Sequence, residues 1–256
     1  PRALVSSCSA NNSNFIRHQE LTSKISDNCL YLCAISKTFN RDSTMPNLVL
    51  PTEIEIIQEL GSGRRSQVYL ANYLGNKVAV KVYKQEYIEK YQSKYHINIG
   101  EFEFARNKVA YEASALTRYV AKPYRLLSPE QGFDLAFIQE YVDGIWLEDL
   151  MEQFNGLPEE VLRAGYYIVE QAAKVGLYDL DIPPGNIRLR QNTVGEWVPK
   201  LYDFNLMPQY MCPPNPFMAM GFKLGLRDKN HRDYRSLKHW DYLGKQASKN
   251  NAKFLS

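Results

Sequence analysis

The sequence predicts an α+β protein with two lobes, and three patterns support this prediction. Short runs rich in β-branched and aromatic residues crowd into residues 53–142, several of them alternating apolar and polar positions. Two longer segments carry apolar residues at helical spacing. An Asp-Gly pair at 143–144 interrupts the chain between the two kinds of pattern. We therefore expect a five-stranded antiparallel sheet with one helix at 49–142, and a reduced, mainly helical lobe at 143–256.

Composition excludes several classes of protein. The 256 residues are 45% hydrophobic and carry a formal net charge of +3, a balance that argues against a nucleic-acid-binding surface. No apolar run approaches the roughly 20 residues of a membrane span. The four cysteines favour free thiols in a cytosolic or other reducing compartment over a disulfide framework: Cys8, Cys29, Cys33 and Cys212. Residues 1–48, rich in Ser and Asn, are expected to form a mobile extension.

The first three expected strands lie at 53–60, 66–73 and 77–83, the last two joined by a tight turn around Gly75. The segment Gly61–Ser66 between the first two reads Gly-Ser-Gly-Arg-Arg-Ser. Glycines there let the backbone approach a ligand closely, and exposed N–H groups in such a loop attract phosphate. An ordinary hairpin turn is the alternative interpretation.

Lys81 lies in the third strand, in the run Val-Ala-Val-Lys-Val. The period of two places it on the same face as Ala79 and Tyr83, from which a lysine can reach beneath the glycine loop. A surface lysine on an edge strand is the alternative. A helix expected from Glu101 to Val120 supplies a candidate partner, because its apolar spacing places Glu112 on the buried stripe. Glu101 and Glu103 replace Glu112 if the helix has a different register.

Two more strands are expected at 124–127 and 134–142, and residues 140–144 read as a linker between the lobes. A strong helix begins at Pro158 and ends at Gly176. Its expected inward face consists of Val161, Gly165, Ile168, Val169 and Ala172.

The stretch Gly176–Asn186 reads GLYDLDIPPGN, and Asp203 follows the next apolar run in LYDFN. Acid, amide and acid at this spacing suit a site that holds a hydroxyl nucleophile and a divalent metal beside a phosphate chain. Ile187–Arg190 and Trp197–Phe204 are expected to form a hairpin between them.

In this order, these segments resemble the protein-kinase-like superfamily over roughly residues 52–206. The glycine loop of that family is similar to Gly61–Val68, its strand lysine to Lys81 and its helix glutamate to Glu112. Its inter-lobe hinge resembles Gln139–Val142. Its catalytic Asp and the Asn five residues later resemble Asp181 and Asn186, and its metal-binding Asp resembles Asp203.

The resemblance implies ATP-dependent phosphoryl transfer with Mg²⁺, or Mn²⁺ in its place. Asp181, Lys81 and Glu112 are the implied catalytic residues, and Asn186 and Asp203 the implied metal ligands. Asp179 is then left to cap the loop or to support Asp181. The implied ATP-binding residues are Gly61, Ser62, Gly63, Ser66, Val68, Ala79, Lys81, Glu140 and Val142.

Departures from the family pattern leave the acceptor open. Asp179-Leu180 stands where His-Arg is usual, and Pro183 stands where Ser/Thr protein kinases have a lysine. The Pro-Gly-Asn ending instead resembles small-molecule kinases, and Asn205 replaces the glycine of the DFG motif. A protein Ser/Thr kinase, a small-molecule kinase and a nucleotide-binding pseudokinase are therefore the three alternatives.

The part of the chain after Asn205 carries weaker signals. It is short for the C-terminal lobe of a protein kinase. In this it resembles the compact effector kinases that pathogenic bacteria inject into host cells, and the resemblance implies a secreted effector of that kind. Residues 207–217 are expected to form an irregular loop, and 231–242 a final amphipathic helix. A reduced activation segment predicts activity without phosphorylation between Asn205 and Gly225.

Overall fold

The structure is a computed structural model that describes residues 48–204, 216–226 and 228–254. The extension expected at residues 1–48 and the loop expected at 207–217 fall almost wholly outside the described residues. Residues 49–256 form one compact unit. Within that unit, the boundary between residues 142 and 143 remains a prediction.

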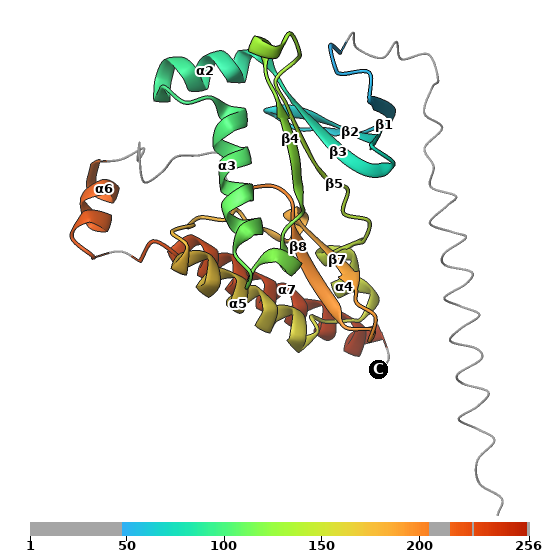
Figure 1. Cartoon of the computed structure of the whole chain (residues 1–256). Coiled ribbons are helices and arrows are strands. Elements are labelled where there is room, and N and C mark those ends of the chain that lie inside the picture. The colour runs from blue at the N-terminus through green and yellow to red at the C-terminus, as the bar shows by residue number, and fades with distance from the viewer. Residues whose placement is uncertain (1–47, 205–215, 227, 255–256) are drawn as a thin grey trace, which may run out of the picture. The chain divides into compact units, whose positions relative to one another are not determined.

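Five antiparallel strands form the sheet of the N-terminal lobe, as the sequence predicts (Figure 1). Their order across the sheet is β1-β2-β3-β5-β4. The central strand β3 pairs with β2 on one side and with β5 on the other, and Lys81 lies opposite Val68 and Phe137. The strand bounds are β1 Ile54–Ser62, β2 Ser66–Tyr73, β3 Asn76–Tyr83, β4 Pro123–Leu127 and β5 Ala136–Glu140.

Two helices accompany this sheet, where the sequence analysis expected one. The charged connector after β3 is helix α2 (Gln85–Tyr95), which buries Tyr91 and packs the partly buried Tyr87, Ile88 and Tyr95 against the same hydrophobic cluster. Helix α3 (Ile99–Glu112) begins with the Asn98 side chain accepting hydrogen bonds from two N–H groups of the first turn. It packs beside β4 and β5, where the ring of Phe104 meets Phe137 edge-to-face.

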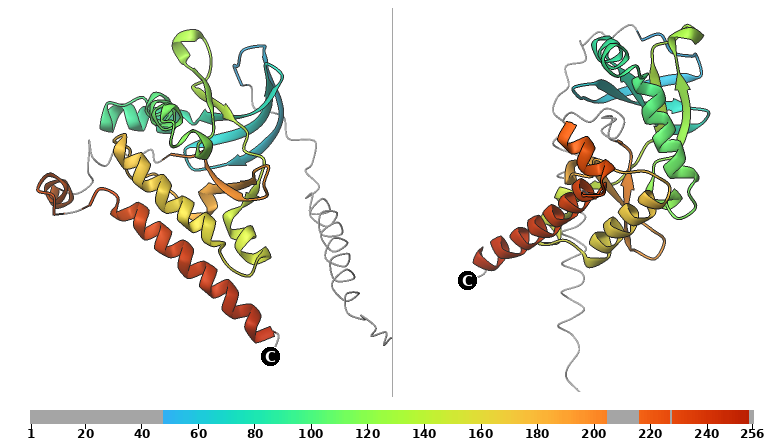
Figure 2. Two further views of the ribbon diagram at one scale, coloured as in Figure 1. Left: turned by 60° about the horizontal axis from the view of Figure 1, so that its bottom comes forward. Right: turned by 90° about the vertical axis from the view of Figure 1, so that its left-hand side faces the viewer.

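The C-terminal lobe combines helices with a small sheet. Its strands are β6 (Ile145–Trp146), β7 (Ile187–Gln191) and β8 (Trp197–Leu201), and the last two form the expected hairpin. Helices α5 and α7 lie side by side, below the five-stranded sheet in the views of Figure 2. The described helices of this lobe are α4 Leu147–Gln153, α5 Glu159–Lys174, α6 Pro216–Lys223 and α7 His231–Phe254.

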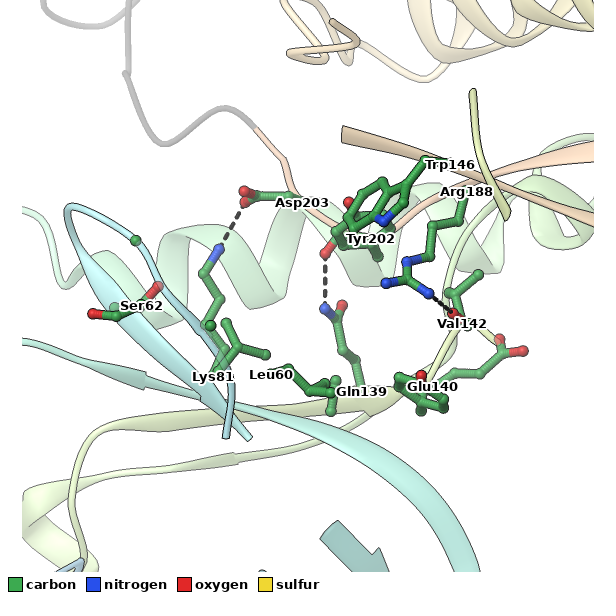
Figure 3. Close-up of a pocket in the computed structure, with 16 residues that line it drawn as sticks. Leu60, Ser62, Lys81, Gln139, Glu140, Val142, Trp146, Arg188, Tyr202 and Asp203 are labelled. Atoms are coloured by element: carbon green, nitrogen blue, oxygen red, sulfur yellow. Dashed lines mark hydrogen bonds and ion pairs between the residues drawn. The ribbon is translucent and has the colours of Figure 1, made fainter. Parts of the chain in front are cut away.

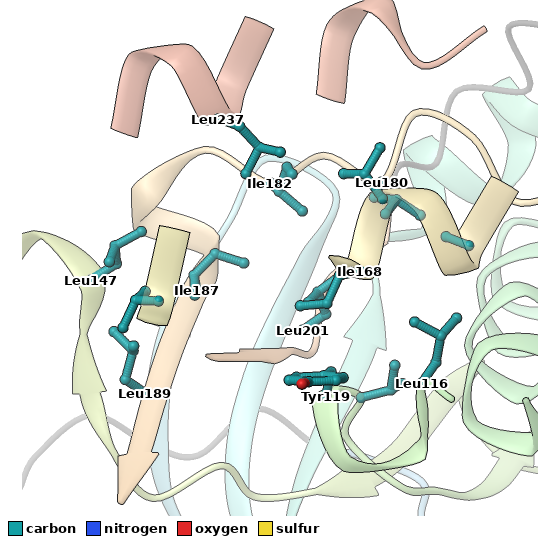
Figure 4. Packing of buried hydrophobic residues seen from close by; sticks show 14 of the residues in the cluster. Leu116, Tyr119, Leu147, Ile168, Leu180, Ile182, Ile187, Leu189, Leu201 and Leu237 are labelled. Atoms are coloured by element: carbon teal, nitrogen blue, oxygen red, sulfur yellow. The ribbon is translucent and has the colours of Figure 1, made fainter. Parts of the chain in front are cut away.

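The largest hydrophobic core lies in this lobe, between α5, α7, β7, β8 and the end of α3 (Figure 4). The predicted inward face of α5 is buried at all five positions. Gly165 is required by the close packing of the two long helices, because a Cβ there would lie 2.6 Å from Leu237 and 2.8 Å from Trp240. This packing holds α7 against the loop that precedes β7.

Short 3₁₀ turns occur at Thr117–Tyr119, Pro129–Gln131 and Pro184–Asn186. Among the described residues, no helix is long and apolar enough to cross a membrane.

Candidate active site

One lysine joins two carboxylates at the centre of the site. Lys81 on β3 is 6% exposed, and its Nζ lies 2.7 Å from Oε1 of Glu103 and 2.7 Å from Oδ1 of Asp203. Glu103 belongs to α3 and Asp203 follows β8, so the two ion pairs tie the sheet to both. Figure 3 shows the pair between Lys81 and Asp203. An ammonium group has three N–H donors, so a third remains for another anion.

The carboxylate that pairs with Lys81 is Glu103, and our expectation of Glu112 was wrong. Glu103 is fully buried, and its second oxygen accepts a hydrogen bond from the Tyr83 hydroxyl. Glu112 has a 62% exposed side chain and lies 3.7 Å from Lys108 on the same helix. The error has a physical cause: two positions of the expected apolar stripe, Ala105 and Val109, are exposed, and the buried face of α3 instead carries the polar residues Glu103 and Asn107.

Electrostatics maintain the charge on Lys81. Burial by itself would lower the pKa of this lysine, but the charges of Asp203 and Glu103 raise it above its ordinary value. Burial raises the pKa of Glu103, and the Lys81 ammonium opposes that rise. Burial also raises the pKa of the Tyr83 hydroxyl well above its ordinary value, which keeps the hydroxyl a neutral donor.

A pocket of about 350 Å³ opens beside Lys81, beneath the glycine loop (Figure 3). All nine residues predicted to bind ATP line it, so the structure brings together positions spread from Gly61 to Val142. Apolar side chains of Leu60, Val68 and Ala79 face the pocket from the sheet. Their contact with a nucleotide remains a prediction. The other residues that line the pocket include Gln139, Tyr141, Trp146, Arg188, Tyr202 and Asp203.

Two arginines of β7 hold the linker that forms one edge of this pocket. Arg190 donates to the carbonyl oxygens of Tyr141 and Asp143 at 3.4 and 3.2 Å, and lies 3.0 Å from the Glu140 carboxylate. Arg188 donates to the other two carbonyl oxygens of the linker, at 3.5 Å for Val142 and 3.2 Å for Gly144. Four consecutive carbonyls, 141–144, are therefore bonded to guanidinium groups.

The close approach of this linker to β7 depends on a glycine. A Cβ at Gly144 would lie 2.3 Å from the carbonyl oxygen of Leu189, too close for any side chain. Arg188 also forms part of the pocket wall, with its guanidinium 4.1 Å from the ring centroid of Trp146. Gln139 lies in the same wall and donates to the carbonyl of Tyr202 at 2.8 Å.

The loop that carries Asp181 has an unusual backbone. Asp179 and Asp181 have φ angles of +57° and +56°, in the left-handed region that non-glycine residues seldom adopt. Asp233 on α7 fixes this conformation, because its two carboxylate oxygens accept hydrogen bonds from the N–H groups of Asp179 at 2.9 Å and Leu180 at 2.8 Å. Burial raises the pKa of Asp233 to about 7, although the two N–H groups oppose the rise.

Three further side chains hold the same loop. Arg106 on α3 donates to the carbonyl of Tyr178 at 2.7 Å, which connects the helix of Glu103 to the loop. Arg232 lies 2.7 Å from the Asp179 carboxylate, and the Trp240 indole N–H donates to the carbonyl of residue 182 at 2.9 Å. Asp179 thus has a structural part in the loop, whereas the Asp181 carboxylate forms no ion pair or hydrogen bond with the described residues.

Asp181 is half-buried and lines a second cavity, which shares no lining residue with the pocket beside Lys81. Burial raises its pKa, and the charge of Asp203 raises it further, while Arg232 is the strongest opposing charge. Asn186 donates from Nδ2 to the Asp181 carbonyl at 3.1 Å. Its Oδ1 makes no hydrogen bond with the described residues, so an amide oxygen remains for another partner.

The oxygen atoms near the loop suit Mg²⁺. Oδ1 of Asp203 contacts Lys81, and no described residue donates to its Oδ2. The described residues contain no cluster of three or more His, Cys, Asp and Glu that would hold a metal by protein ligands alone. Mg²⁺ is commonly bound through one or two carboxylates together with phosphate oxygens and water, so Asp203 and Asn186 fit a metal that enters with a phosphate chain.

Sequence reasoning missed several residues that shape the site. Arg188 and Arg190 lie in the strand expected at Ile187–Arg190, where neither was assigned a role, and Arg106 and Asp233 were not singled out. A buried acid within the first turn of an amphipathic helix is a signal for a structural partner. The partners of Asp233 are the N–H groups of Asp179 and Leu180, 54 and 53 residues earlier in the chain, and no local pattern identifies them.

No protein-family model and no curated protein matches the chain. Among solved structures, it is similar to the PknI kinase domain of Mycobacterium tuberculosis. That alignment has 22% identity and a TM-score of 0.49, and covers 78% of this chain and 79% of that one. A mutant of the same domain matches at 22% identity and a TM-score of 0.49, over 76% of this chain and 74% of that one. A double mutant matches at 20% identity and a TM-score of 0.49, over 78% and 79%.

Proposed function

We propose that this protein transfers the γ-phosphoryl group of ATP to a hydroxyl group, with Mg²⁺ as cofactor. The observation that carries the proposal is the buried Lys81, which contacts both Glu103 and Asp203 at 2.7 Å beside a pocket beneath a glycine loop. A buried ammonium with an unused donor is suited to hold phosphate oxygens, since phosphoryl transfer depends on positioning and charge neutralisation.

Each charged residue has a distinct part in the proposed reaction. Lys81 binds the α- and β-phosphates, and Glu103 keeps the ammonium in place. Asp203 and Asn186 supply oxygen ligands for Mg²⁺, which neutralises the charge of the β- and γ-phosphates. Asp181 accepts the proton of the acceptor hydroxyl while that oxygen bonds to the γ-phosphorus and the bond to the bridging oxygen breaks, releasing ADP.

The remaining pocket residues bind the nucleoside. Glu140 and Val142 line the pocket, and their backbone groups hydrogen-bond the adenine in the proposed complex. Val68 and Ala79 pack on the base, and the N–H groups of Gly61–Ser66 cover the phosphates. The two β7 arginines keep the linker in the shape that this contact requires.

We propose Ser or Thr of a protein as the acceptor. The Pro-Gly-Asn ending of the loop favours a small molecule as the second candidate, since it resembles small-molecule kinases. The resemblance to compact effector kinases extends the proposal to a role inside a host cell. Finding the chain in the cytosol of infected cells tests that role.

The proposal is tested by incubating the protein with γ-labelled ATP, Mg²⁺ and a mixed protein extract. Asp203→Ala serves as the inactive variant and Glu112→Gln as a matched control that keeps its activity. We expect labelled protein with the wild type and the control, and none with Asp203→Ala. Labelling that survives Asp203→Ala contradicts the proposal. Label in small molecules alone identifies the second candidate, and nucleotide binding without transfer identifies a pseudokinase.

A further inference from the structure

The cavity that Asp181 lines is separate from the nucleotide pocket, since the two share no lining residue. It has a volume of about 430 Å³. The catalytic loop forms one wall with Asp179, Asp181 and Pro183, and one face of α7 forms the other. A hydroxyl that gives its proton to Asp181 must enter through this cavity if the proposed function holds.

Two of the three acids in this cavity are already used within the protein. Asp179 is 3% exposed and paired with Arg232 at 2.7 Å. Asp233 is 2% exposed, and both of its oxygens accept backbone N–H groups of the loop. Asp181 is therefore the one acid among the cavity's lining residues that remains for a substrate.

The basic residues of the cavity have fewer partners within the protein. Arg235 is exposed and makes no ion pair or hydrogen bond with the described residues. His239 is exposed and stacks on the ring of Tyr242. The Arg232 side chain is 43% exposed and has further N–H groups beyond the one that contacts Asp179.

These basic residues lie on a single face of α7. Arg232, Arg235 and His239 are separated by three and four residues, the spacing at which helical side chains are neighbours. From the first to the last, the row is about 10 Å long at 1.5 Å per residue. Such a row reaches beyond the reacting hydroxyl and contacts the groups that flank it in the acceptor.

We propose that the acceptor carries an anionic group, a carboxylate or a phosphate, next to the hydroxyl that is phosphorylated. Arg235 and His239 bind that group while Asp181 takes the proton. A guanidinium that has no partner among the described residues matches the planar oxygens of a carboxylate or phosphate with paired N–H donors. The inference rests on the proposed function and names the substrate class of the same site.

The test compares Ser/Thr peptides that differ in the residues flanking the hydroxyl: glutamate, alanine or lysine. A phosphorylated polyol, myo-inositol 1-phosphate, is assayed alongside them with Mg²⁺ and ATP. The informative variant is Arg235→Glu. Lys238→Glu is the matched control, because it makes the same charge change at an exposed α7 position outside the cavity.

We expect the wild type to prefer an anionic acceptor, and Arg235→Glu to lower kcat/KM for it by about tenfold or more while Lys238→Glu does not. A preference for glutamate-flanked peptides identifies a protein acceptor, and a preference for the polyol identifies a small molecule. Equal rates for all three peptides and no turnover of the polyol overturn the inference while leaving the proposed function intact.

Fluorescence anisotropy of the labelled glutamate-flanked peptide, and its competition by the polyol, measures binding without turnover. If the wild type transfers no phosphate but binds the peptide, and Arg235→Glu weakens that binding, the result contradicts the proposed function and supports the anionic-ligand site. Unchanged binding in Arg235→Glu overturns the inference in either case.

Discussion

Most residues of the pocket around Lys81 come from strands β1, β2, β3 and β5 of one sheet and the linker after it, and the others come from β6, β7 and the segment after β8. The loop around Asp181 is instead held by Asp233 of helix α7, 54 residues after Asp179 and 53 after Leu180. We refer to the residues that line the pocket as the nucleotide side. We refer to the loop 179–186 and the α7 face opposite it as the acceptor side. The two sides share no lining residue, so damage to one is expected to leave the other functional.

The largest effect is expected on the nucleotide side, at the residue that both carboxylates contact. Lys81→Met removes the charge that pairs with Glu103 and Asp203 and leaves two acids beside the phosphate site. We expect transfer to fall by about 10³-fold, the scale at which preorganised charges act. The measurement is single-turnover transfer of labelled phosphate. Activity within tenfold of the wild type would show that the ammonium is not part of the reaction.

The second test compares two glutamates of the same helix. Glu103→Gln is expected to lower kcat/KM by roughly 10- to 100-fold, because the Lys81 ammonium loses its buried counter-charge and its fixed position. Glu112→Gln is expected to stay within about twofold, because its side chain faces solvent. Thermal unfolding of both variants separates a loss of stability from a loss of positioning. A larger loss at Glu112 than at Glu103 would refute the assignment.

On the acceptor side, Asp233→Asn is expected to reduce kcat while the nucleotide Kd changes little. The amide has one acceptor oxygen where the acid has two, so one N–H of the loop loses its partner. A buried unsatisfied donor costs about 1–3 kcal/mol of stability. Urea unfolding and calorimetric nucleotide titration measure the two effects. The separation of the two sides fails if nucleotide affinity falls as much as kcat.

The reverse pattern is expected for the linker. Arg190→Ala removes the hydrogen bonds to two linker carbonyls and the ion pair with Glu140, while leaving Asp181 and its supports in place. We expect the Kd of Mg-ATP to rise by about two- to tenfold, with kcat at saturating nucleotide nearly unchanged. Titration calorimetry and steady-state rates decide the point. An unchanged Kd would mean that the linker keeps its shape without the arginine.

The smallest effect concerns pH. Asp181 must be ionised to accept a proton, and its raised pKa shifts the acid limb of the kcat/KM profile above the ordinary range for Asp. Arg232 lowers that pKa, so Arg232→Gln is expected to move the limb to higher pH by a few tenths of a unit. At pH values below the limb, kcat/KM of Arg232→Gln falls relative to the wild type, and at pH values above the limb it does not. A limb that stays in place or moves to lower pH argues against Asp181 as the titrating group.

The same contrast explains what the sequence could predict. Strand alternation and glycine spacing are local, so all five strands and the whole predicted set of pocket residues were found. The choice between Glu103 and Glu112 depended on which face of α3 is buried. Apolar spacing selected the face of Ala105 and Val109, which is exposed, whereas the buried face carries the polar Glu103 and Asn107. A buried carboxylate that pairs with a lysine of another element has no apolar periodicity, so hydrophobic spacing alone selected the wrong acid.

The acceptor side was predictable in part. Asp181 was selected by its five-residue distance from Asn186, and Asp179 was left without a firm role. The contacts that separate the two acids come from Asp233 and Arg232 on α7. These depend on how the two long helices pack, which local patterns do not specify. The β7 arginines had the same limitation, since alternation places them on a face without naming the linker as their partner.

The most direct test of the account combines both sides in one variant, Asp181→Asn. The substitution keeps the size of the side chain and removes its ability to accept a proton. We predict that calorimetry gives a Kd for Mg-ATP within about twofold of the wild type, while phosphate transfer falls by at least about 10²-fold. Transfer at the wild-type rate, or loss of nucleotide binding together with transfer, would contradict the account.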